Sequence, residues 1–402
     1  MSRALDVFLV AGEPSGDRLG GALMAGLKSQ TDVSFRGVGG PNMAAQGLNS
    51  LFAMADLSVM GLLEVLPRVP RLLRRIRETV TAAVAARPDV LITIDSPDFC
   101  LRVASGLRRV MPDLKVVHYV APSVWAWRPE RAEKMARYVD HVLALLPFEP
   151  PYMEAAGMSC DFVGHPLVAE PVPTAADVAA LRKDLRIGAA PVVLLLPGSR
   201  VGEIRRLLPI YEEVTKRVAA VHRDLRFCVP LADGVADDLS GRLSMWAVPV
   251  VVLNPQGRPL EEAAHRKRTV FRMAAAALAT SGTVVLELAA ADCPQVTAYR
   301  ANWATTRLVR KMARIDTANL LNIVTDTRVI PEFLFGKCTA ETITPALLGV
   351  LSDPGAQKAA AAGTMKALGL GGEDPGVRAA KSVLGFLGRG GAHPISVGNP
   401  PS

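Results

Sequence analysis

The 402-residue sequence has few aromatic residues, few cysteines and no long apolar run. Only 5% of its residues are Phe, Trp or Tyr although 50% are hydrophobic, so aliphatic side chains must fill the core. The five cysteines lie far apart without a C-x-x-C pair, which argues against a zinc site or disulfide framework and favours a reducing cytoplasm. No apolar run reaches the ~20 residues of a membrane span, and the N-terminus lacks a signal peptide. We expect a protein that is soluble or lies on a membrane without crossing it.

Several nucleotide-binding and nucleic-acid-binding signatures are also missing. The chain has no G-x-x-x-x-G-K-[ST] loop, which disfavours ATP or GTP hydrolysis, and no G-x-G-x-x-G fingerprint in its first glycine-rich turn. Lys and Arg number 46 against 38 Asp and Glu, a mild basic bias that suits an anionic membrane or phosphorylated substrates. No RRM, KH, helix-turn-helix or finger pattern accompanies it, so no nucleic acid is expected as a partner. No aspartate-rich metal signature is evident, and we expect no metal or other cofactor.

The chain does contain short apolar strands that end abruptly in turn residues. The clearest is 90–94, whose β-branched residues are typical of a parallel strand buried on both faces. Asp95 ends it, and Pro97 cannot continue a ladder of hydrogen bonds. Ligands of open α/β sheets bind outside the carboxyl ends of the strands, which makes Asp95 a catalytic candidate. Asp-Ser-Pro-Asp is also good turn chemistry, and from this segment alone a simple cap is the stronger interpretation.

The first predicted strand, 6–11, leads into a glycine-rich turn at 12–21 and a helix that reaches Leu27. This order of elements is the first half of a βαβ unit. A tight turn with Ser15 or Asp17 as the cap of the helix is as good an interpretation as a ligand-binding loop.

Two further strand ends in the second half carry small and polar residues. The strand 192–196 ends in Pro-Gly-Ser-Arg at 197–200, and a strand near 275–279 gives way to Thr-Ser-Gly-Thr at 280–283 and a helix. Amides at the start of such a helix, with the guanidinium of Arg200, would cradle an anion. Each turn alone could be a routine helix cap, whereas two in one domain favour a diphosphate site.

Residues 59–77 combine apolar side chains at helical spacing with dense positive charge. This composition suits a helix that lies among anionic lipid headgroups, but it also suits an ordinary amphipathic helix packed on the sheet. Pro67 and Pro70 should divide the segment. The apolar residues are Leu62, Leu66, Val69, Leu73 and Ile76, and the basic ones are Arg68, Arg71, Arg74, Arg75 and Arg77.

The loop after the strand 115–120 contains two of the four tryptophans, Trp125 and Trp127, followed by Arg128. Such a loop could form a wall against a sugar or an acyl chain, or a hydrophobic plug between helices. Residues 166–190 are rich in Pro and Ala and predict a domain boundary, and the end from 389 onward has the composition of a disordered tail. We therefore expect domains at 1–168 and 169–352, C-terminal helices at 353–388 that pack back toward the first domain, and a disordered tail at 389–402.

Taken in order, several blocks resemble lipid A disaccharide synthases, the bacterial glycosyltransferases that join two acylated glucosamines. The resemblance runs from about residue 8 to about residue 350, and the tryptophan-containing block is highly specific. The blocks are AGEPSGD (11–17), VMGLLEVL (59–66), IDSPDF (94–99), HYVAPSVWAWR (118–128), LPFE (146–149), FVGHP (162–166), LPGSR (196–200) and TSGT (280–283).

The resemblance implies an α/β GT-B fold, with two Rossmann-like doubly wound domains facing across a cleft and a C-terminal helix crossing back to the first. It implies an inverting, metal-independent transfer from UDP-2,3-diacylglucosamine to 2,3-diacylglucosamine 1-phosphate (lipid X), in the biosynthesis of the lipid A of lipopolysaccharide. It also implies a cytoplasmic protein on the inner face of the cytoplasmic membrane of a Gram-negative bacterium. A homodimer stays open.

The family pattern further implies roles for individual residues. Asp95 would be the general base, with Asp98 and Glu13 as rival carboxylates. The residues implied for UDP-sugar binding are Ser15, Gly16, Gly198, Ser199, Arg200, Thr280, Ser281, Gly282, Thr283, Glu287, Asn322 and Glu332. Those implied for the acceptor and the membrane are Met60, Leu62, Leu66, Arg71, Leu73, Arg74, Trp125 and Trp127. Leu321, where the family usually has proline, and the divergent stretch 232–275 depart from the pattern and leave the uracil contacts open.

Two other classes of function remain open at this point. A UDP-sugar 2-epimerase of the same fold would share the nucleotide loops but would need neither a lipid-binding segment nor the tryptophan loop. A non-catalytic nucleotide-sugar or membrane-binding protein could also keep the fold, although the intact Asp95, Arg200 and Ser281 argue against it.

Overall fold

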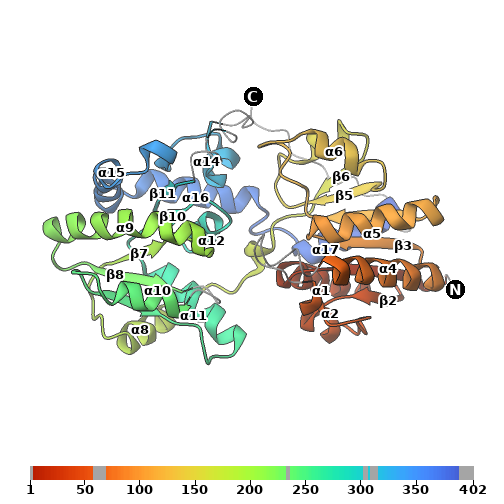
Figure 1. Cartoon of the computed structure of the whole chain (residues 1–402), viewed down its shortest axis with the longest axis horizontal. Coiled ribbons are helices and arrows are strands. Elements are labelled where there is room, and N and C mark those ends of the chain that lie inside the picture. Colours follow the sequence, from red (N-terminus) through yellow and green to blue (C-terminus); the bar gives the residue numbers. More distant parts are fainter. Residues whose placement is uncertain (1–2, 58–68, 232–235, 302–306, 308–315, 389–402) are drawn as a thin grey trace. The chain divides into compact units, whose positions relative to one another are not determined.

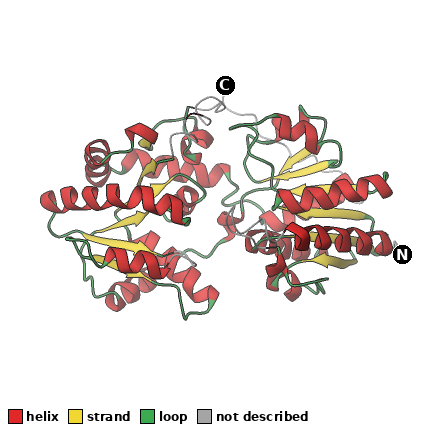
Figure 2. Ribbon diagram, in the orientation of Figure 1, coloured by secondary structure: helices red, strands yellow, loops and turns green. Residues whose placement is uncertain are grey.

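A computed structural model of the chain describes residues 3–57, 69–231, 236–301, 307 and 316–388. The chain divides into two compact units, Met1–Ala169 with Gly371–Ser402 (unit 1) and Glu170–Leu370 (unit 2). Each unit is built on a six-stranded parallel sheet between layers of helices (Figures 1 and 2). The predicted α/β class with two doubly wound sheets is confirmed.

The sheet of unit 1 has the strand order β2-β1-β3-β4-β5-β6, and every neighbouring pair is parallel. The strands are β1 (Leu5–Ala11), β2 (Val33–Val38), β3 (Val90–Ile94), β4 (Lys115–Tyr119), β5 (His141–Ala144) and β6 (Ser159–Phe162). The helices are α1 (Pro14–Lys28), α2 (Pro41–Ala45), η1 (Met54–Asp56), α4 (Val69–Ala86), α5 (Pro97–Val110), α6 (Glu130–Met135), α7 (Pro150–Glu154), η3 (Pro166–Ala169) and α17 (Pro375–Phe386).

Strand β3 shows why the apolar runs are continuous. All five of its residues are buried, and successive side chains enter different cores. Leu91 packs in a cluster with Val103 of α5, while Ile92 and Ile94 pack in a cluster with Leu23 of α1. Helices therefore cover both faces of the sheet, so the strand needs apolar residues on both sides.

The C-terminal helix α17 belongs to unit 1 and lies along α1 (Figure 1). The two backbones approach so closely that a Cβ atom built on Gly26 would lie 2.4 Å from the carbonyl oxygen of Gly376. At the other end of α17, the Ser382 hydroxyl donates to Asp161 (2.6 Å) and lies 2.8 Å from Nε2 of the buried His141. The predicted return of a C-terminal helix to the first domain is thus observed.

The sheet of unit 2 has the order β12-β11-β10-β7-β8-β9 and is also parallel throughout. Its strands are β7 (Val192–Leu196), β8 (Arg226–Pro230), β9 (Val250–Leu253), β10 (Ala276–Thr280), β11 (Gln295–Tyr299) and β12 (Glu332–Leu334). Its helices are α8 (Ala175–Asp184), α9 (Val201–Val221), α10 (Ala236–Leu243), α11 (Leu260–Met273), α12 (Val284–Ala290), α14 (Leu320–Thr325), η4 (Phe335–Lys337), α15 (Ala340–Ser352) and α16 (Gly355–Ala367).

Helix α16 differs from the expectation for 353–388. It packs against α12 and α14 and so lies in unit 2, whereas the expectation from the sequence is that the C-terminal helices pack toward the first domain. Only α17, after the chain leaves unit 2 at Leu370, packs on α1. The predicted tail, 389–402, lies outside the described residues.

In each sheet the strand order reverses at one point. The reversal lies between β1 and β3 in unit 1 and between β7 and β10 in unit 2. At such a point the loops after the two central strands diverge to opposite faces and leave a crevice, where open α/β sheets bind ligands. A ligand site is therefore expected at the loops that follow the four central strands. These loops are residues 12–15, 95–98, 197–200 and 281–283.

Candidate active site

The reversal point of unit 1 brings Ser15 and Asp95 together. The Ser15 hydroxyl donates to Oδ2 of Asp95 at 3.0 Å, and the Ser96 amide donates to Oδ1 at 2.9 Å. Asp95 is half-buried and directly follows β3, as predicted. Neither Ser15 nor Asp17 caps α1 with its side chain, so the alternative interpretation of the first turn does not hold.

Asp98 and Glu13, the two rival carboxylates, are both exposed. Asp98 lies in the first turn of α5, and Glu13 occupies the position before α1. Burial raises the pKa of the Cys100 thiol to about 12, and the negative charges of Asp95 and Glu13 add to this effect. Of the three acids, Asp95 is the one that other groups hold in a fixed orientation.

The tryptophan loop rests on a buried acid, Glu149. Trp125 donates its indole N–H to Glu149 (3.4 Å) and meets the ring of Phe148 edge to face at 5.1 Å. Glu149 also accepts the amides of Leu145 and Leu146, and burial raises its pKa to about 7. Trp127 is 38% exposed and has the Arg128 guanidinium 4.4 Å from its ring centre. Trp125 therefore resembles the predicted plug, whereas Trp127 stays available as a wall.

In unit 2, the loop after β7 presents Arg200. Gly198 has φ of +109°, and a Cβ atom there would lie 2.8 Å from Glu203 Oε2, so the turn requires glycine. Arg200 occupies the N-cap position of α9, and its side chain is 84% exposed and contacts Glu203 at 3.4 Å. Ser199 is exposed beside it. The guanidinium can therefore turn towards an anion at this loop.

The loop after β10 lies on the other side of the reversal point. Its Ser281 hydroxyl donates to the carbonyl oxygen of Ala318 at 2.9 Å, which ties the loop to 316–319. Gly282 and Thr283 are exposed ahead of α12. Glu287, on α12, is paired with Lys267 of α11 at 2.6 Å. Because β7 and β10 are neighbours, the structure brings Gly198–Arg200 and Thr280–Thr283 to one edge of the sheet.

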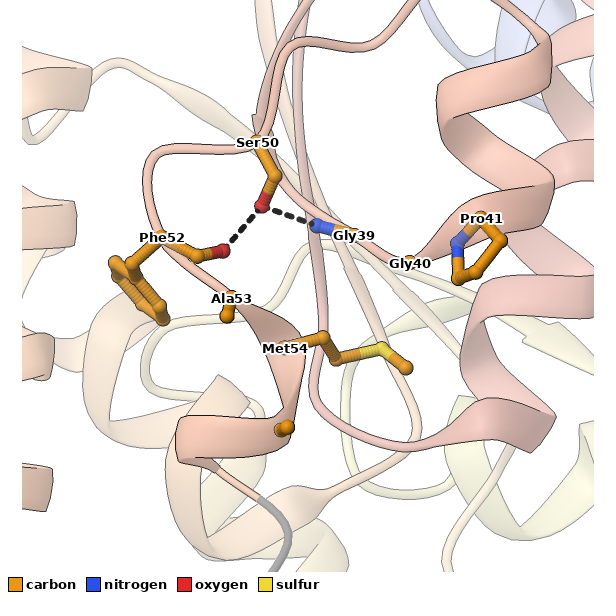
Figure 3. Close-up of a pocket in the computed structure, with 8 residues that line it drawn as sticks. Gly39, Gly40, Pro41, Ser50, Phe52, Ala53 and Met54 are labelled. Carbon is orange, nitrogen blue, oxygen red and sulfur yellow. Dashed lines mark hydrogen bonds between the residues drawn. The ribbon is translucent and has the colours of Figure 1, made fainter.

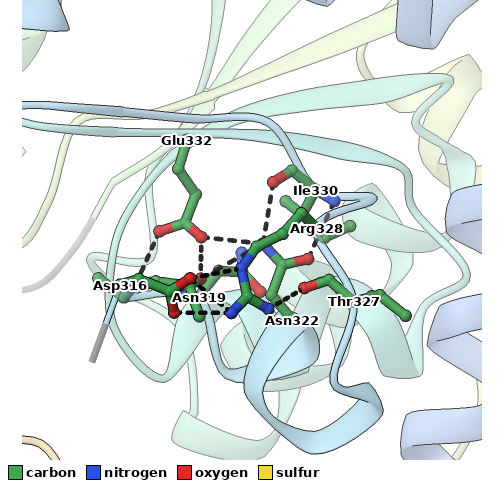
Figure 4. A network of polar contacts seen from close by, with 9 residues as sticks. Asp316, Asn319, Asn322, Thr327, Arg328, Ile330 and Glu332 are labelled. Atoms are coloured by element: carbon green, nitrogen blue, oxygen red, sulfur yellow. Dashed lines mark hydrogen bonds and ion pairs between the residues drawn. The ribbon is translucent and has the colours of Figure 1, made fainter. Parts of the chain in front are cut away.

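A network behind this edge contains Asn322 and Glu332 (Figure 4). Glu332 accepts from the Ala318 amide and the Asn322 side chain, both at 2.8 Å, and from the Thr317 hydroxyl. Asn322 is fully buried, and it exchanges bonds of 3.0 and 3.1 Å with the backbone of Ile330. Both residues therefore hold the loop that receives Ser281. A direct contact of Asn322 with a nucleotide would require this network to open.

Helix α4 includes the second part of the predicted membrane segment. The described part of this helix runs from Val69 to Ala86. Val69 and Leu73 are 38% and 41% exposed, and Arg74 is exposed as well. Arg71 and Arg75 both form ion pairs with Asp56, so the charges of these two arginines are paired within unit 1. Met60, Leu62 and Leu66 lie outside the described residues.

Within the described part of the chain, no three His, Cys, Asp or Glu side chains gather into a group that could hold a metal ion. None of the helices described there is long and apolar enough to cross a membrane.

A family model described as lipid-A-disaccharide synthetase matches residues 7–374. The chain belongs to this family. The lipid-A-disaccharide synthase of Ruegeria pomeroyi is 57% identical over 386 residues, which cover 96% of this chain and 96% of the relative. The lipid-A-disaccharide synthetase family thus accounts for almost the whole sequence, including both reversal points.

Solved structures of low sequence identity share the fold. The co-structure of S. aureus MnaA with UDP has a TM-score of 0.65 at 9% identity and covers 96% of this chain and 98% of its own. The UDP-GlcNAc 2-epimerase of Neisseria meningitidis bound to UDP-GlcNAc has a TM-score of 0.59 at 11% identity and covers 96% and 99%. This likeness confirms the GT-B architecture.

Some residues of the site region were not found from the sequence. Asp17 is buried, and its carboxylate accepts from the amides of Gly40 (2.8 Å), Asn42 (2.9 Å) and Met43 (3.0 Å), which fixes the loop after β2. Glu149 occurs in a family block, but nothing in that block signals burial. Neither carboxylate has a local sequence signal for this role, because Asp17 accepts amides 23 to 26 residues later in the chain and Glu149 accepts the indole N–H of Trp125, 24 residues earlier.

Proposed function

We propose that this member of the lipid-A-disaccharide synthetase family transfers 2,3-diacylglucosamine from UDP to 2,3-diacylglucosamine 1-phosphate. The products would be UDP and the β(1′-6)-linked disaccharide phosphate. The hydrogen bond between Ser15 and Asp95 carries the proposal, because it joins the family blocks AGEPSGD and IDSPDF at the reversal point of unit 1. Family membership along nearly the whole chain supports it.

Asp95 is the proposed general base. Inversion by a single in-line attack requires a base that takes the proton of the acceptor hydroxyl as the bond to the anomeric carbon forms. Ser15 and the Ser96 amide each hold one carboxylate oxygen, so the orientation of the carboxylate is set before the acceptor arrives. The second lone pair of either oxygen remains able to accept the proton.

Unit 2 is proposed to hold UDP without a metal ion. As the glycosidic bond to UDP breaks, negative charge develops on the leaving diphosphate. The exposed guanidinium of Arg200 and the loop Ser281–Thr283 lie on the two sides of the reversal point, where they could stabilise this charge. The network of Glu332 and Asn322 would act as support, since it fixes the carbonyl that Ser281 binds.

Both substrates carry fatty acyl chains, so we also propose that the protein works on the inner surface of the cytoplasmic membrane. The outward-facing Val69 and Leu73 of α4, with Arg74 next to them, support this assignment. Apolar side chains flanked by arginine bind anionic lipid surfaces through both burial and charge.

The test is disaccharide formation in mixed micelles by wild type and Asp95→Asn. Loss of one general base should lower kcat by ~10²–10⁴-fold. Asp98→Asn is the matched control, because Asp98 is an exposed aspartate three residues along the same chain segment. Its rate should stay within about threefold of wild type, since a surface carboxylate that holds no partner in the site contributes little.

Equal rates for wild type and Asp95→Asn would move the base to Glu13 or Asp98. Conversion of a UDP-sugar in the absence of any lipid acceptor would favour the epimerase instead. UDP binding by Asp95→Asn, measured by calorimetry, would separate loss of the base from loss of donor binding, because the proposed UDP loops lie in the other unit. An unchanged urea unfolding midpoint would show that the variant is folded.

A further inference from the structure

Unit 1 contains a pocket of about 570 Å³ at the carboxyl end of β2 (Figure 3). Its walls are the Gly39-Gly40-Pro41 turn on one side and Ser50 with residues 52–55 on the other. The side chains that line it include Phe52, Ala53 and Met54, all apolar. This volume falls within the roughly 300–1,000 Å³ that is usual for small-molecule sites.

Three polar groups at this pocket are already paired, namely the Ser50 hydroxyl and the amides of Gly39 and Gly40. The Ser50 hydroxyl donates to the carbonyl of Phe52 at 2.7 Å and accepts the amide of Gly39 at 3.2 Å (Figure 3). The amide of Gly40 donates to Asp17, and Pro41 has no N–H to offer. A sugar or a phosphate would gain no hydrogen bond from these three groups and would lose its bonds to water, whereas a hydrocarbon chain would lose none.

The pocket lies beside the candidate acceptor site. Asp17, whose carboxylate accepts the Gly40 amide at 2.8 Å, follows Ser15 by two residues on the first turn of α1. Ser15 in turn donates to Asp95 at 3.0 Å. β1 and β2 are hydrogen-bonded neighbours, so the loops at their carboxyl ends adjoin each other. A molecule bound at Asp95 can therefore place one of its substituents in the pocket.

The outer wall of the pocket is fixed to helix α4. Asp56, at the end of η1, binds both Arg71 and Arg75 of that helix. The Arg75 guanidinium also stacks 4.4 Å from the centre of the Phe52 ring. The same helix exposes Val69 and Leu73, so the pocket wall and the proposed lipid-facing surface are parts of one rigid arrangement.

We propose that this pocket receives one fatty acyl chain of the acceptor, 2,3-diacylglucosamine 1-phosphate. The inference rests on the proposed function and adds to it a subsite that measures chain length. The acyl chain is assigned to the acceptor and not to the donor, because unit 1 contains the proposed base that must contact the acceptor hydroxyl. Ala53 and Met54 would then set how much of the chain is buried.

The experiment compares acceptors with tetradecanoyl and butanoyl chains at a constant donor. Each buried methylene strengthens binding about fourfold, so a side chain that fills the pocket should weaken the binding of a long-chain acceptor far more than that of a short-chain one. In Ala53→Phe we expect the ratio of kcat/KM for the long acceptor over the short one to fall about tenfold or more. Ala53 is exposed, so the larger ring does not have to enter the core. Ala155→Phe, at an exposed alanine after α7, is the matched control and should keep the wild-type ratio.

A second variant, Met54→Ala, should shift the preference in the opposite direction, towards hexadecanoyl over tetradecanoyl acceptors, because it removes side-chain volume from the wall. An unchanged ratio in Ala53→Phe, with wild type active, overturns the pocket assignment and leaves the proposed function intact. The assignment is also overturned if the effect of Ala53→Phe on kcat/KM depends on the acyl length of the donor and not on that of the acceptor. If wild type forms no disaccharide from either acceptor, the proposed function fails, and the acyl subsite fails with it.

Discussion

At the scale of single residues, the turn after β3 adopts an uncommon backbone conformation. Asp95 and Ser96 have φ of +52° and +43°, in the left-handed region that non-glycine residues rarely occupy. The Asp95 amide donates to Tyr119 (2.9 Å), and the Ser96 carbonyl accepts the amides of Phe99 (3.0 Å) and Cys100 (2.9 Å), which compensates for the strain. Strain of ~1–3 kcal/mol per residue is typical of functional sites. It ends the strand abruptly and directs the Asp95 carboxylate at Ser15.

Glu149 should make stability depend on pH. Its pKa is about 7 in the folded protein against an ordinary 4.5, so the folded state binds a proton that the unfolded state has released between these values. Stability from this group is complete below pH 4.5 and is lost as pH rises through 7. At about 1.4 kcal/mol per pKa unit, the loss is about 3 kcal/mol or less.

Urea unfolding of wild type and Glu149→Gln between pH 5 and pH 8 measures this loss. We expect the difference in unfolding free energy between the two proteins to change with pH in favour of the variant, because Gln cannot ionise. The difference is needed because burial lowers the pKa of His118 and His165 to about 4, which raises stability with pH over the acidic part of the range. A difference that is constant with pH would contradict the assignment.

The sequence predicts that Asp95 is a catalytic candidate, but it does not predict the structural roles of Asp17 and Asn322. Asp95 follows a buried strand rich in β-branched residues and stands two residues before Pro97, which is a local signal. Asp17 instead accepts amides 23 to 26 residues away, and Asn322 is fixed by Glu332 ten residues later. The resemblance assigned Asn322 to the nucleotide, and the fold shows that it is buried behind the loop.

At the scale of elements, the contact between α1 and α17 depends on two glycines. A Cβ atom on Gly26 would lie 2.4 Å from a backbone oxygen of α17, and backbone cannot move aside as a side chain can. We expect Gly26→Ala to lower stability by about 1–3 kcal/mol, the usual cost of forcing atoms into a packed interface.

Gly385→Ala is the matched control for this contact. It lies in α17, is exposed, and has nothing within 4 Å of its added Cβ. Because alanine favours helix over glycine by up to about 1 kcal/mol, this variant should be equal to or more stable than wild type. The measurement is the thermal unfolding midpoint of wild type and the two variants. Equal midpoints for Gly26→Ala and wild type would contradict the close approach of the α1 and α17 backbones.

Most strands could be predicted because a parallel strand needs apolar residues on both faces and must end where glycine or proline stops it. β1, β3, β7 and β10 all follow this rule, and their four loops form the two reversal points. The order of the strands in each sheet could not be predicted from residues alone. It depends on which helices cover which face, and the resemblance implies doubly wound domains without giving the order of their strands.

At the scale of the whole molecule, the exposed apolar residues of α4 should set how strongly the protein binds vesicles. Val69→Ser with Leu73→Ser should weaken sedimentation with anionic vesicles by roughly tenfold or more, since two half-exposed aliphatic side chains contribute about 1 kcal/mol each. Val110→Ser, which alters a more exposed valine at the end of α5, is the control and should bind as wild type does. Equal binding by all three proteins would exclude docking through α4.

Unit 2 is one uninterrupted stretch of chain, whereas unit 1 is assembled from segments on both sides of it. A ribosome therefore delivers the whole of unit 2 before it has made α17. Until that helix emerges, Leu23 and Leu27 of α1 lack the Val383 and Leu384 side chains that share their core. The unit translated first is thus completed last, and a nascent chain released before residue 375 would pair a finished second unit with an unfinished first one.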